Sequence, residues 1–139
     1  MVDAERLEAR LLRLERLLEL LDATRASGVD AYLRDEERRA ATERRLQLAI
    51  QVCIDVGAQL VSELSARPPS DYADVFLSLA ETGMIDRSLA ERLGRAAGQR
   101  NLLVHAYLDI DDRQVFESLS RLEDLRAFAA VAQRRAAAG

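Results

Sequence analysis

Residues 100–107 read Arg-Asn-Leu-Leu-Val-His-Ala-Tyr and include His105, the only histidine of the chain. The apolar run at the centre of this stretch favours a helix. On a helix, at about 100° per residue, Arg100 and Tyr107 lie two turns apart and point almost the same way. Asn101 and His105, four residues apart, share a second edge, roughly 140° round from Arg100. One short segment is therefore predicted to present a cation, an amide, an imidazole and a phenol.

These side chains are suited to cleaving a phosphodiester without a metal ion. Arginine can hold a phosphate in a bidentate grip, and histidine can move a proton. In RNA, His105 would help the ribose 2′-hydroxyl attack or protonate the leaving oxygen, while Arg100 would stabilise the charged phosphorane. The alternative is structural, because a lone histidine on a helix is often a satisfied side chain and the spacing alone is not specific.

The same residues resemble the R-x4-H-x-Y signature of HepT-like proteins, a prokaryotic branch of the HEPN superfamily, with every motif position filled. The resemblance extends to the pattern Pro-Ser-x-Tyr-x-x-x-Phe-x-x-Leu at residues 69–79, which Gly83-Met84-Ile85 follows. It implies a small all-helical toxin that dimerises and acts as a ribonuclease on RNA, tRNA included. It also implies a partner, a nucleotidyltransferase antitoxin of the MntA type, so that the homodimer works alone or inside a larger hetero-oligomer.

Each motif residue has an expected role. His105 is the general acid and base, Arg100 is the phosphate and transition-state clamp, and Asn101 orients the substrate or contacts phosphate. Tyr107 is regulatory or structural. In the systems that this chain resembles, the partner nucleotidyltransferase adenylylates the motif tyrosine, and a bulky anionic AMP beside the cleft would repel RNA. HEPN ribonucleases build composite sites, so the resemblance implies a two-fold dimer with its cleft at the interface.

Composition favours one all-helical domain over residues 1–139. Hydrophobic residues make up 49% of the chain and charged residues 32%, while aromatic residues make up 4% and there are two prolines. This balance argues against a β-sandwich or barrel. Cys53 is the only cysteine, which excludes an intrachain disulfide and makes a structural zinc site improbable. We expect no metal ion, no cofactor and no membrane span, and we expect the cytoplasm as the compartment.

The net charge of −4 argues against a protein that coats nucleic acid in general. It leaves room for a ribonuclease with a local site.

The expected architecture is a five-helix antiparallel bundle of the HEPN type, with the reactive residues on the fourth helix. Hydrophobic periodicity, cap residues and the Pro68-Pro69 break define these helices. They run from Asp3 to about Arg25, Asp30 to Ser65, Asp71 to Ala80, Asp86 to about Tyr107, and Arg113 to about Arg135. Residues 136–139 are expected to be a frayed tail.

The first helix carries a wide leucine stripe that is predicted to face the core: Leu7, Leu11, Leu14, Leu18 and Leu21, widened by Leu12, Leu17 and Leu20. In the second helix, Gly57 falls on the apolar seam, which predicts the close approach of another helix from the same chain or from a dimer partner. Gly98 leaves room either for substrate or for packing.

Three further positions carry open alternatives. Asp55 interrupts an apolar run and sits either on a solvent edge or opposite Arg100 and His105, where it would orient the imidazole. Tyr72 is interpreted as a core or rim residue of the third helix. Arg92 and Arg95 are ordinary surface or an extension of a positive strip for RNA phosphates.

Two other classes of function compete with the nuclease. The chain could be a catalytically silent HEPN module that binds the nucleotidyltransferase or a nucleotide. It could also be a scaffold whose apolar seams serve oligomerisation alone. Retention of all three motif residues favours the nuclease.

Overall fold

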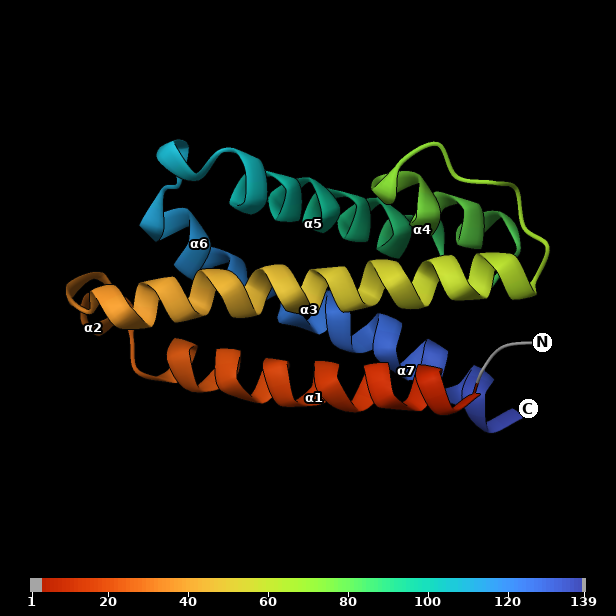
Figure 1. Cartoon of the computed structure of the whole chain (residues 1–139), viewed down its shortest axis with the longest axis horizontal. Coiled ribbons are helices and arrows are strands. Elements are labelled where there is room, and N and C mark those ends of the chain that lie inside the picture. The colour runs from red at the N-terminus through yellow and green to blue at the C-terminus, as the bar shows by residue number, and fades with distance from the viewer. Residues whose placement is uncertain (1–3, 139) are drawn as a thin grey trace.

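The computed structural model describes residues 4–138, which form helices and connecting turns without a strand (Figure 1). The helices are α1 (Ala4–Ala26), α2 (Val29–Arg34), α3 (Glu36–Glu63), α4 (Tyr72–Glu81), α5 (Arg87–His105), α6 (Asp112–Ser118) and α7 (Leu122–Ala138). Two short 3-10 turns, η1 (Tyr107–Asp109) and η2 (Leu119–Arg121), complete them. The all-helical prediction is confirmed, but the predicted second and fifth helices are each broken in two, so the count of five is wrong.

The long helix α3 is the centre of the bundle. Figure 1 shows it running the length of the molecule, with α1 along one side and α4 and α5 along the other. It packs against α1, α4, α5 and α7. The packing face of α3 consists of small and aliphatic residues: Leu46, Ala49, Ile50, Cys53, Ile54, Val56, Gly57, Leu60 and Val61. Four neighbours on one helix explain why this face is wider than a coiled-coil seam.

Helix α1 buries most of its predicted leucine stripe. Leu7, Leu11, Leu14, Leu18 and Leu21 are buried, as is Leu17. Leu20 is half-buried. Leu12 is 68% exposed, so its assignment to the stripe is wrong. The reason is angular, because Leu12 follows Leu11 by about 100° and so turns out of the face that meets α3 and α7.

The break between α2 and α3 lies at Asp35, inside the predicted continuous helix. Its backbone is extended (φ −116°, ψ 96°), and its carboxylate accepts a hydrogen bond from the Arg38 amide at 3.0 Å. Aspartate in this role is a strong helix start, and the acidic Glu36 and Glu37 that follow complement the positive end of the helix dipole. The cap at Asp35 therefore starts a new helix, although the hydrophobic periodicity predicts one continuous helix here.

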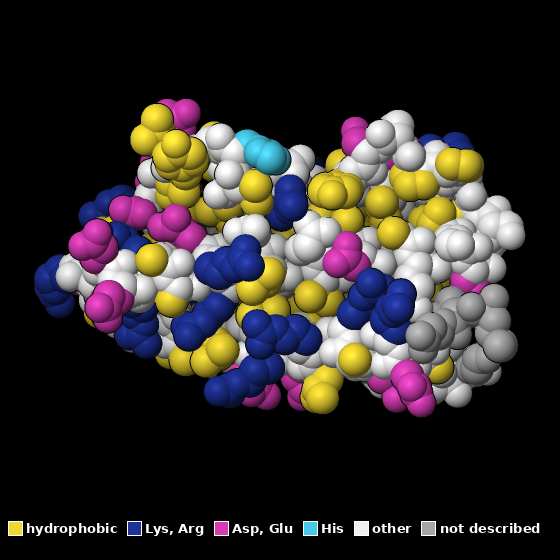
Figure 2. Space-filling view, viewed as in Figure 1, with side chains coloured by type: hydrophobic (Ala, Val, Ile, Leu, Met, Phe, Trp, Pro, Cys, Tyr) yellow, Lys and Arg dark blue, Asp and Glu magenta, His cyan; other side chains and the backbone are white. Residues whose placement is uncertain are grey.

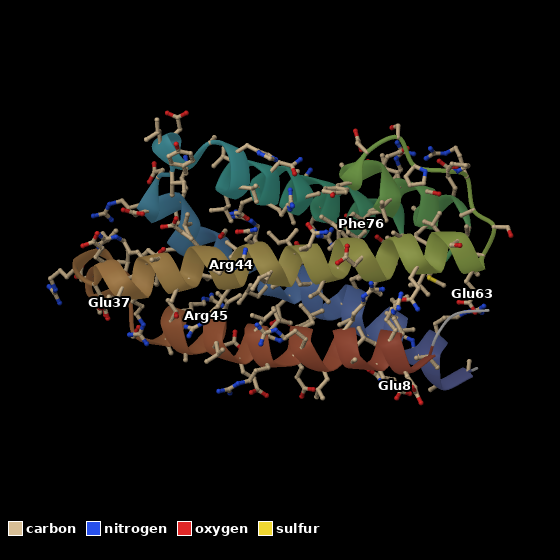
Figure 3. All side chains as sticks on the ribbon, viewed as in Figure 1. Glu8, Glu37, Arg44, Arg45, Glu63 and Phe76 are labelled. Carbon is tan, nitrogen blue, oxygen red and sulfur yellow. The ribbon has the colours of Figure 1, made fainter. Side chains whose placement is uncertain are left out.

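Gly57 is the point of closest approach between α3 and its neighbours, as predicted. A Cβ atom on this residue would lie 2.7 Å from Cγ1 of Val75 in α4 and 3.6 Å from the rings of Phe76 in α4 and Phe128 in α7. The approaching helices belong to the same chain. The rings of Phe76 and Phe128 meet edge to face, with centroids 5.3 Å apart, and Figure 3 shows Phe76 between α4 and α3.

Both helices that build the candidate site begin after an aspartate cap. Asp71 accepts from the Asp74 amide at 2.8 Å to start α4, and Asp86 accepts from the Leu89 amide at 2.7 Å to start α5. Asp111 does the same for α6, accepting from Arg113 and Gln114. Each cap satisfies amides that would otherwise lack a partner.

The predicted fifth helix consists of α6, η2 and α7. Six residues of this helix are predicted from their spacing to face the core. Five are buried, namely Val115, Leu119, Leu122, Leu125 and Phe128, and the sixth, Ala129, is partly buried and packs against the core. Ser118 and Ser120 donate hydrogen bonds to the carbonyls of Val115 and Glu117. These hydroxyls compete with backbone amides for the carbonyl oxygens, which favours the tighter 3-10 turn at this point.

The predicted frayed tail is wrong for residues 136–138, which continue α7. Alanines favour the helix, Ala136 packs on the core, and Arg135 is tied to Glu63 of α3 at 3.2 Å. Gly139 lies outside the residues that the structure describes, as does Asp3, the predicted start of α1. Within 4–138, none of the helices is both long and apolar enough to cross a membrane.

A matched pair of glycines tests the packing of α3. Gly57→Ala should lower the free energy of unfolding by about 1–3 kcal/mol, because the new methyl group meets Val75 in a filled core. Gly98→Ala should raise it by roughly 0.5–1 kcal/mol, because a Cβ there meets nothing within 4 Å and alanine is the better helix former. Urea denaturation monitored by circular dichroism measures both, and equal effects of the two changes would contradict the assignment of Gly57 as a packing residue.

Candidate active site

Helix α5 carries Arg100, Asn101 and His105 and ends at His105. The amide of Ala106 closes the last turn onto the carbonyl of Leu102, and Ala106 itself leaves helical geometry (φ −115°, ψ 43°). Tyr107 therefore begins the η1 turn, and the prediction that it shares a helical face with Arg100 is wrong. The acidic stretch from Asp109 onward explains the stop, because carboxylates are unfavourable at a helix C-terminus and favourable as the cap of the next helix.

Arg100 is half-buried and is held by two contacts. Its Nη1 donates to Oδ1 of Asn101 at 3.0 Å. Its guanidinium carbon, Cζ, lies 5.2 Å from the ring centroid of Tyr72, the first residue of α4. Its Nε is buried without a hydrogen-bond partner. Within residues 4–138, Arg100 forms no ion pair with a carboxylate, so its charge is not neutralised by the protein.

His105 is exposed at the end of α5. Its ring has no hydrogen-bond partner in the part of the chain that the structure describes. Figure 2 shows the histidine on the surface of the molecule rather than inside it. No described residue satisfies the ring as the structural alternative requires, and the imidazole is available to a ligand from solvent.

The hydrogen bond between Arg100 and Asn101 joins the two edges of α5. Five residues on a helix place Arg100 and His105 about 140° apart, so they do not face each other by spacing alone. Asn101 lies one turn before His105, on the same side of the helix. Because the guanidinium reaches across to Asn101, its free N–H groups are brought towards the edge that carries the imidazole.

Sequence reasoning did not recognise Tyr72 as part of this arrangement. The residue is 43% exposed, and its ring lies against Arg100 rather than in the core. Phe76, one turn further on, is the buried member of the pair, with 1% exposure. No local pattern links Tyr72 to Arg100, because their contact depends on the packing of α4 against α5.

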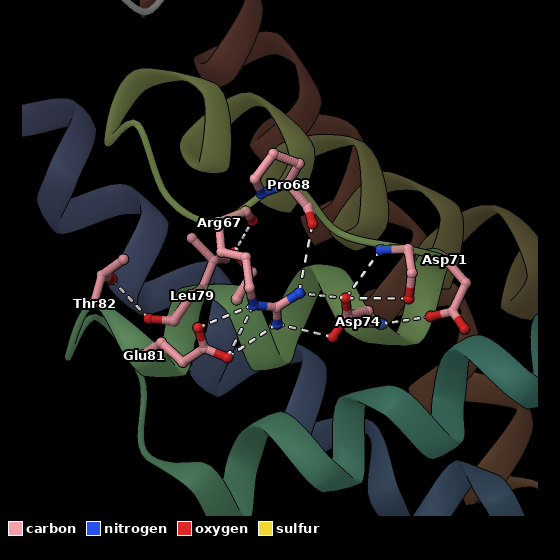
Figure 4. A network of polar contacts seen from close by, with 9 residues as sticks. Arg67, Pro68, Asp71, Asp74, Leu79, Glu81 and Thr82 are labelled. Carbon is pink, nitrogen blue, oxygen red and sulfur yellow. Dashed lines mark hydrogen bonds and ion pairs between the residues drawn. The ribbon is translucent and has the colours of Figure 1, made fainter.

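An arginine clamp, drawn in Figure 4, fixes the start of α4. Tyr72 is the first residue of this helix. Arg67 binds Asp74 through Nη1 and Nη2 at 2.7 and 3.0 Å, and it binds Glu81 through Nε and Nη2 at 3.0 and 2.9 Å. Asp74 also accepts from the amide of Ser70 at 2.9 Å. The loop with Pro68 and Pro69 is thereby tied to both ends of α4. Sequence reasoning treated this loop only as a helix break.

The clamp shifts the acidities of its members. Hydrogen bonds from Arg67, then from the amide of Ser70, hold the pKa of Asp74 far below its usual value. The hydrogen bond from Arg67 also lowers the pKa of Glu81. Both carboxylates are therefore charged at neutral pH and remain so well into the acidic range.

Asp55 has a local partner. Its Oδ1 accepts from Nε2 of Gln51 at 2.8 Å, one turn earlier on α3, and the side chain is half-buried. No ion pair or hydrogen bond joins Asp55 to Arg100 or His105 among the residues described. The solvent-edge interpretation agrees with these contacts, and a role in orienting His105 has no contact to support it.

The open surroundings of Gly98 remove the packing explanation for this residue, since a Cβ atom would meet no neighbour within 4 Å. Access of substrate to the helix stays a prediction there. Cys53 fills core space as predicted, and burial raises the pKa of its thiol to about 12.

A cavity of about 610 Å³ borders the motif helix, and Gly98 and Leu102 of α5 are among its lining residues. Gln99 and Leu103 of α5 line it, together with Ile50 of α3 and Val115 of α6. Asn101 follows Gln99 by two residues, which turns it about 200° away from the cavity side of the helix. Arg92 and Arg95 also line this cavity, and Arg92 is bound to Asp124 at 2.8 Å. Arg92 is therefore engaged by a carboxylate of α7, and a part for Arg95 in a positive strip stays a prediction.

The family model described as Ribonuclease HepT-like matches residues 13–132, a range that contains the whole motif and the α3–α4–α5 packing. The chain belongs to the HepT-like family. The tRNA nuclease HepT of Aphanizomenon flos-aquae is 34% identical over 114 residues, which cover 82% of this chain and 78% of that protein. The mRNA nuclease HepT of Shewanella oneidensis is 30% identical over 84 residues, which cover 60% of this chain and 63% of that protein.

The fold is that of solved HepT-type toxins. The tri-AMPylated HEPN toxin of Shewanella oneidensis, solved in complex with its MNT antitoxin, superposes with a TM-score of 0.85 over 96% of this chain and 99% of that chain. Sequence identity between the two is 21%. The likeness shows that the HEPN helical arrangement, predicted from the motif, is correct.

The Arg67 clamp makes the stability of this HepT-like chain depend on pH. Asp74 and Glu81 have lowered pKa values in the folded state, so they stabilise it above their unfolded pKa values, about 3.9 and 4.3. This contribution is lost as the pH falls below about 4. Arg67→Ala should therefore lower the melting temperature at pH 7, and the gap to wild type should narrow at pH 3.

Arg87→Ala is the matched control, because it removes one exposed arginine bound to a single glutamate of its own helix. Its effect should be small at both pH values. Calorimetry measures the melting temperatures. If the difference between wild type and Arg67→Ala were the same at pH 7 and pH 3, the stabilising role of the clamp would be contradicted.

Proposed function

We propose that this chain is the ribonuclease toxin of a prokaryotic toxin–antitoxin system of the HepT–MntA type. Arg100, Asn101 and His105 form its active site, and a nucleotidyltransferase is its antitoxin. The substrate is RNA, and the reaction needs no metal ion. The observation that carries the proposal is an exposed imidazole and an unneutralised guanidinium near the end of one helix, with the guanidinium hydrogen-bonded to Asn101, one turn before the imidazole.

The chemistry follows from RNA itself. The ribose 2′-oxygen attacks phosphorus, a new P–O2′ bond forms, and the bond to the 5′-oxygen of the next nucleotide breaks. His105 takes the proton of the 2′-hydroxyl or gives a proton to the leaving oxygen. Arg100 holds the non-bridging oxygens as negative charge builds on the phosphorane. The products are a 2′,3′-cyclic phosphate and a 5′-hydroxyl end.

A single chain supplies one imidazole and one guanidinium, which is a sparse site for two proton transfers. A homodimer with the motif at its interface would place two sets around one cleft, so that one His105 acts as base and the other as acid. Asn101 and His105 are exposed and Arg100 is half-buried, which leaves their polar groups accessible for such an arrangement. As an RNA-cleaving enzyme, the dimer would act in the cytoplasm.

The charge of the surrounding face suits an RNA strand. Figure 2 shows basic side chains gathered over α3 and α1 on the face where the histidine is visible. Arg44 and Arg45 of α3 are among the residues that Figure 3 labels on this face. Arginines near the site attract phosphates even though the chain carries a net charge of −4.

Tyr107 is the proposed target of the antitoxin. It is 70% exposed on the η1 turn, two residues after His105. Its hydroxyl has no hydrogen-bond partner among residues 4–138. Attack of this oxygen on the α-phosphorus of ATP would release pyrophosphate and the phenolic proton. The AMP group left on Tyr107 would place a bulky anion beside the imidazole and block RNA by volume and by charge.

The catalytic assignment predicts that His105→Ala and Arg100→Ala abolish RNA cleavage and toxicity while melting temperature changes little. Purified protein is incubated with tRNA and with mRNA in the presence of a chelator, and the ends are identified as cyclic phosphates. Arg87→Ala, at the far end of the same helix, should cut like wild type. Full activity of either motif variant would show that the catalytic assignment is wrong, and inertness of the wild type with tight antitoxin binding would favour a silent module.

The assignment of Tyr107 predicts that a substitution there removes adenylylation without removing RNA cleavage. Tyr107→Phe should keep RNA cleavage but should gain no adenylyl group when incubated with ATP and the cognate nucleotidyltransferase. Intact-mass spectrometry detects the modification, and a cleavage assay before and after the incubation measures its effect. Tyr72→Phe, which changes the other exposed tyrosine, should still be modified. Modification of Tyr107→Phe would place the target elsewhere.

A further inference from the structure

The contact between Tyr72 and Arg100 is the least expected feature of the site. The guanidinium lies over the ring at 5.2 Å, inside the range of about 6 Å for a cation–π interaction. Neither residue makes the contact that is most common for its type, which is a carboxylate for arginine and core packing for a tyrosine ring. Among the residues that the structure describes, no carboxylate binds Arg100, and the ring of Tyr72 is 43% exposed instead of packed in the core.

The geometry of a guanidinium explains why an aromatic partner differs from a carboxylate. All N–H groups of arginine lie in the plane of the group and point outward from its edge. A carboxylate binds that edge and uses the donors, as Asp74 and Glu81 do with Arg67. An aromatic ring attracts the cation without acting as a carboxylate acceptor, and a guanidinium stacked on a ring keeps the N–H groups of its edge free.

The free edge of Arg100 is where a phosphate would bind. One Nη1 hydrogen is used by Asn101, and Nε is buried. The donors that remain are on the two Nη atoms, the pair with which arginine grips a phosphate. The ring and Asn101 together hold the guanidinium in one plane with these donors available.

The position of Tyr72 is itself well determined. It is the first residue of α4, directly after the Asp71 cap, and the Arg67 clamp ties the preceding loop to α4. Helix α4 cannot shift easily, because Val75 and Phe76 pack against Gly57 of α3. A rigid base under the ring is what a positioning role needs.

We propose that Tyr72 is a positioning residue of the nuclease site. Its ring holds the Arg100 guanidinium by the face and so keeps the N–H edge directed at the scissile phosphate. The inference rests on the proposed function, because it gives Tyr72 a part in the same cleavage step. Tyr72 acts through Arg100 and makes no bond to the reacting atoms.

Two substitutions of Tyr72 distinguish the effect of its aromatic face from the effects of its volume and of its hydroxyl group. Tyr72→Phe keeps the aromatic face and should cleave RNA like wild type. Tyr72→Leu keeps an apolar side chain but removes the face, and its kcat should fall roughly 2- to 30-fold, the range of one cation–π contact. The KM for RNA should change less than kcat, because the aligned guanidinium matters most as charge develops.

A second measurement does not depend on activity. In proton NMR, the Hε of Arg100, assigned with Arg100→Ala, should be shifted upfield by the ring current in wild type and in Tyr72→Phe. This shift should be absent in Tyr72→Leu. Thermal unfolding of both Tyr72 variants should stay near wild type, because the side chain is partly exposed.

The outcomes distinguish the two proposals. A normal kcat for Tyr72→Leu, with His105→Ala inactive, would overturn the role of Tyr72 and leave the nuclease proposal intact. Equal losses for the Phe and Leu variants would assign the effect to the hydroxyl and also overturn it. An active His105→Ala would refute the nuclease site itself. Retained activity and NMR shift in the Phe variant, with both lost in the Leu variant, would support the positioning role.

Discussion

The close packing of α4 on α3 at Gly57 is the constraint on which the site depends. A glycine there allows Val75 and Phe76 to approach the α3 backbone more closely than any side chain would permit. Helix α4 also packs along α5. The depth at which α4 sits against α3 therefore determines where Tyr72 meets Arg100. The core packing at Gly57 and the surface contact between Tyr72 and Arg100 therefore depend on each other through α4.

Arg67 and Arg100 show two uses of the same side chain on neighbouring elements. Arg67 meets two carboxylates, which consume its donors and make it a structural clamp. Arg100 contacts the ring of Tyr72 and the side-chain amide of Asn101. These contacts restrain the guanidinium but leave its charge unpaired and most of its N–H donors free. The type of partner decides which arginine is neutralised and which keeps free donors, more reliably than exposure does, because both lie at least partly at the surface.

Local rules were enough for much of this molecule. The leucine spacing of α1, the caps at Asp71, Asp86 and Asp111, and the motif on α5 are all readable from neighbouring residues. Local rules failed where two of them competed. At Asp35 a cap interrupts a periodic pattern, and at Ala106 the acidic residues downstream end the helix before Tyr107. The contact of Tyr72 with Arg100 could not be read at all, because it depends on how two helices pack.

The end of α5 at His105 has a consequence for control of the site. Had the helix continued, Tyr107 would have shared the face of Arg100, which lies over α4. Because Ala106 leaves the helix, Tyr107 and Leu108 instead project on a short turn, 70% and 85% exposed. The hydroxyl is then open to a partner enzyme while only Ala106 separates it from the imidazole. A group attached to Tyr107 would stand beside His105 without disturbing the Arg100 contacts, so the site could be blocked without being dismantled.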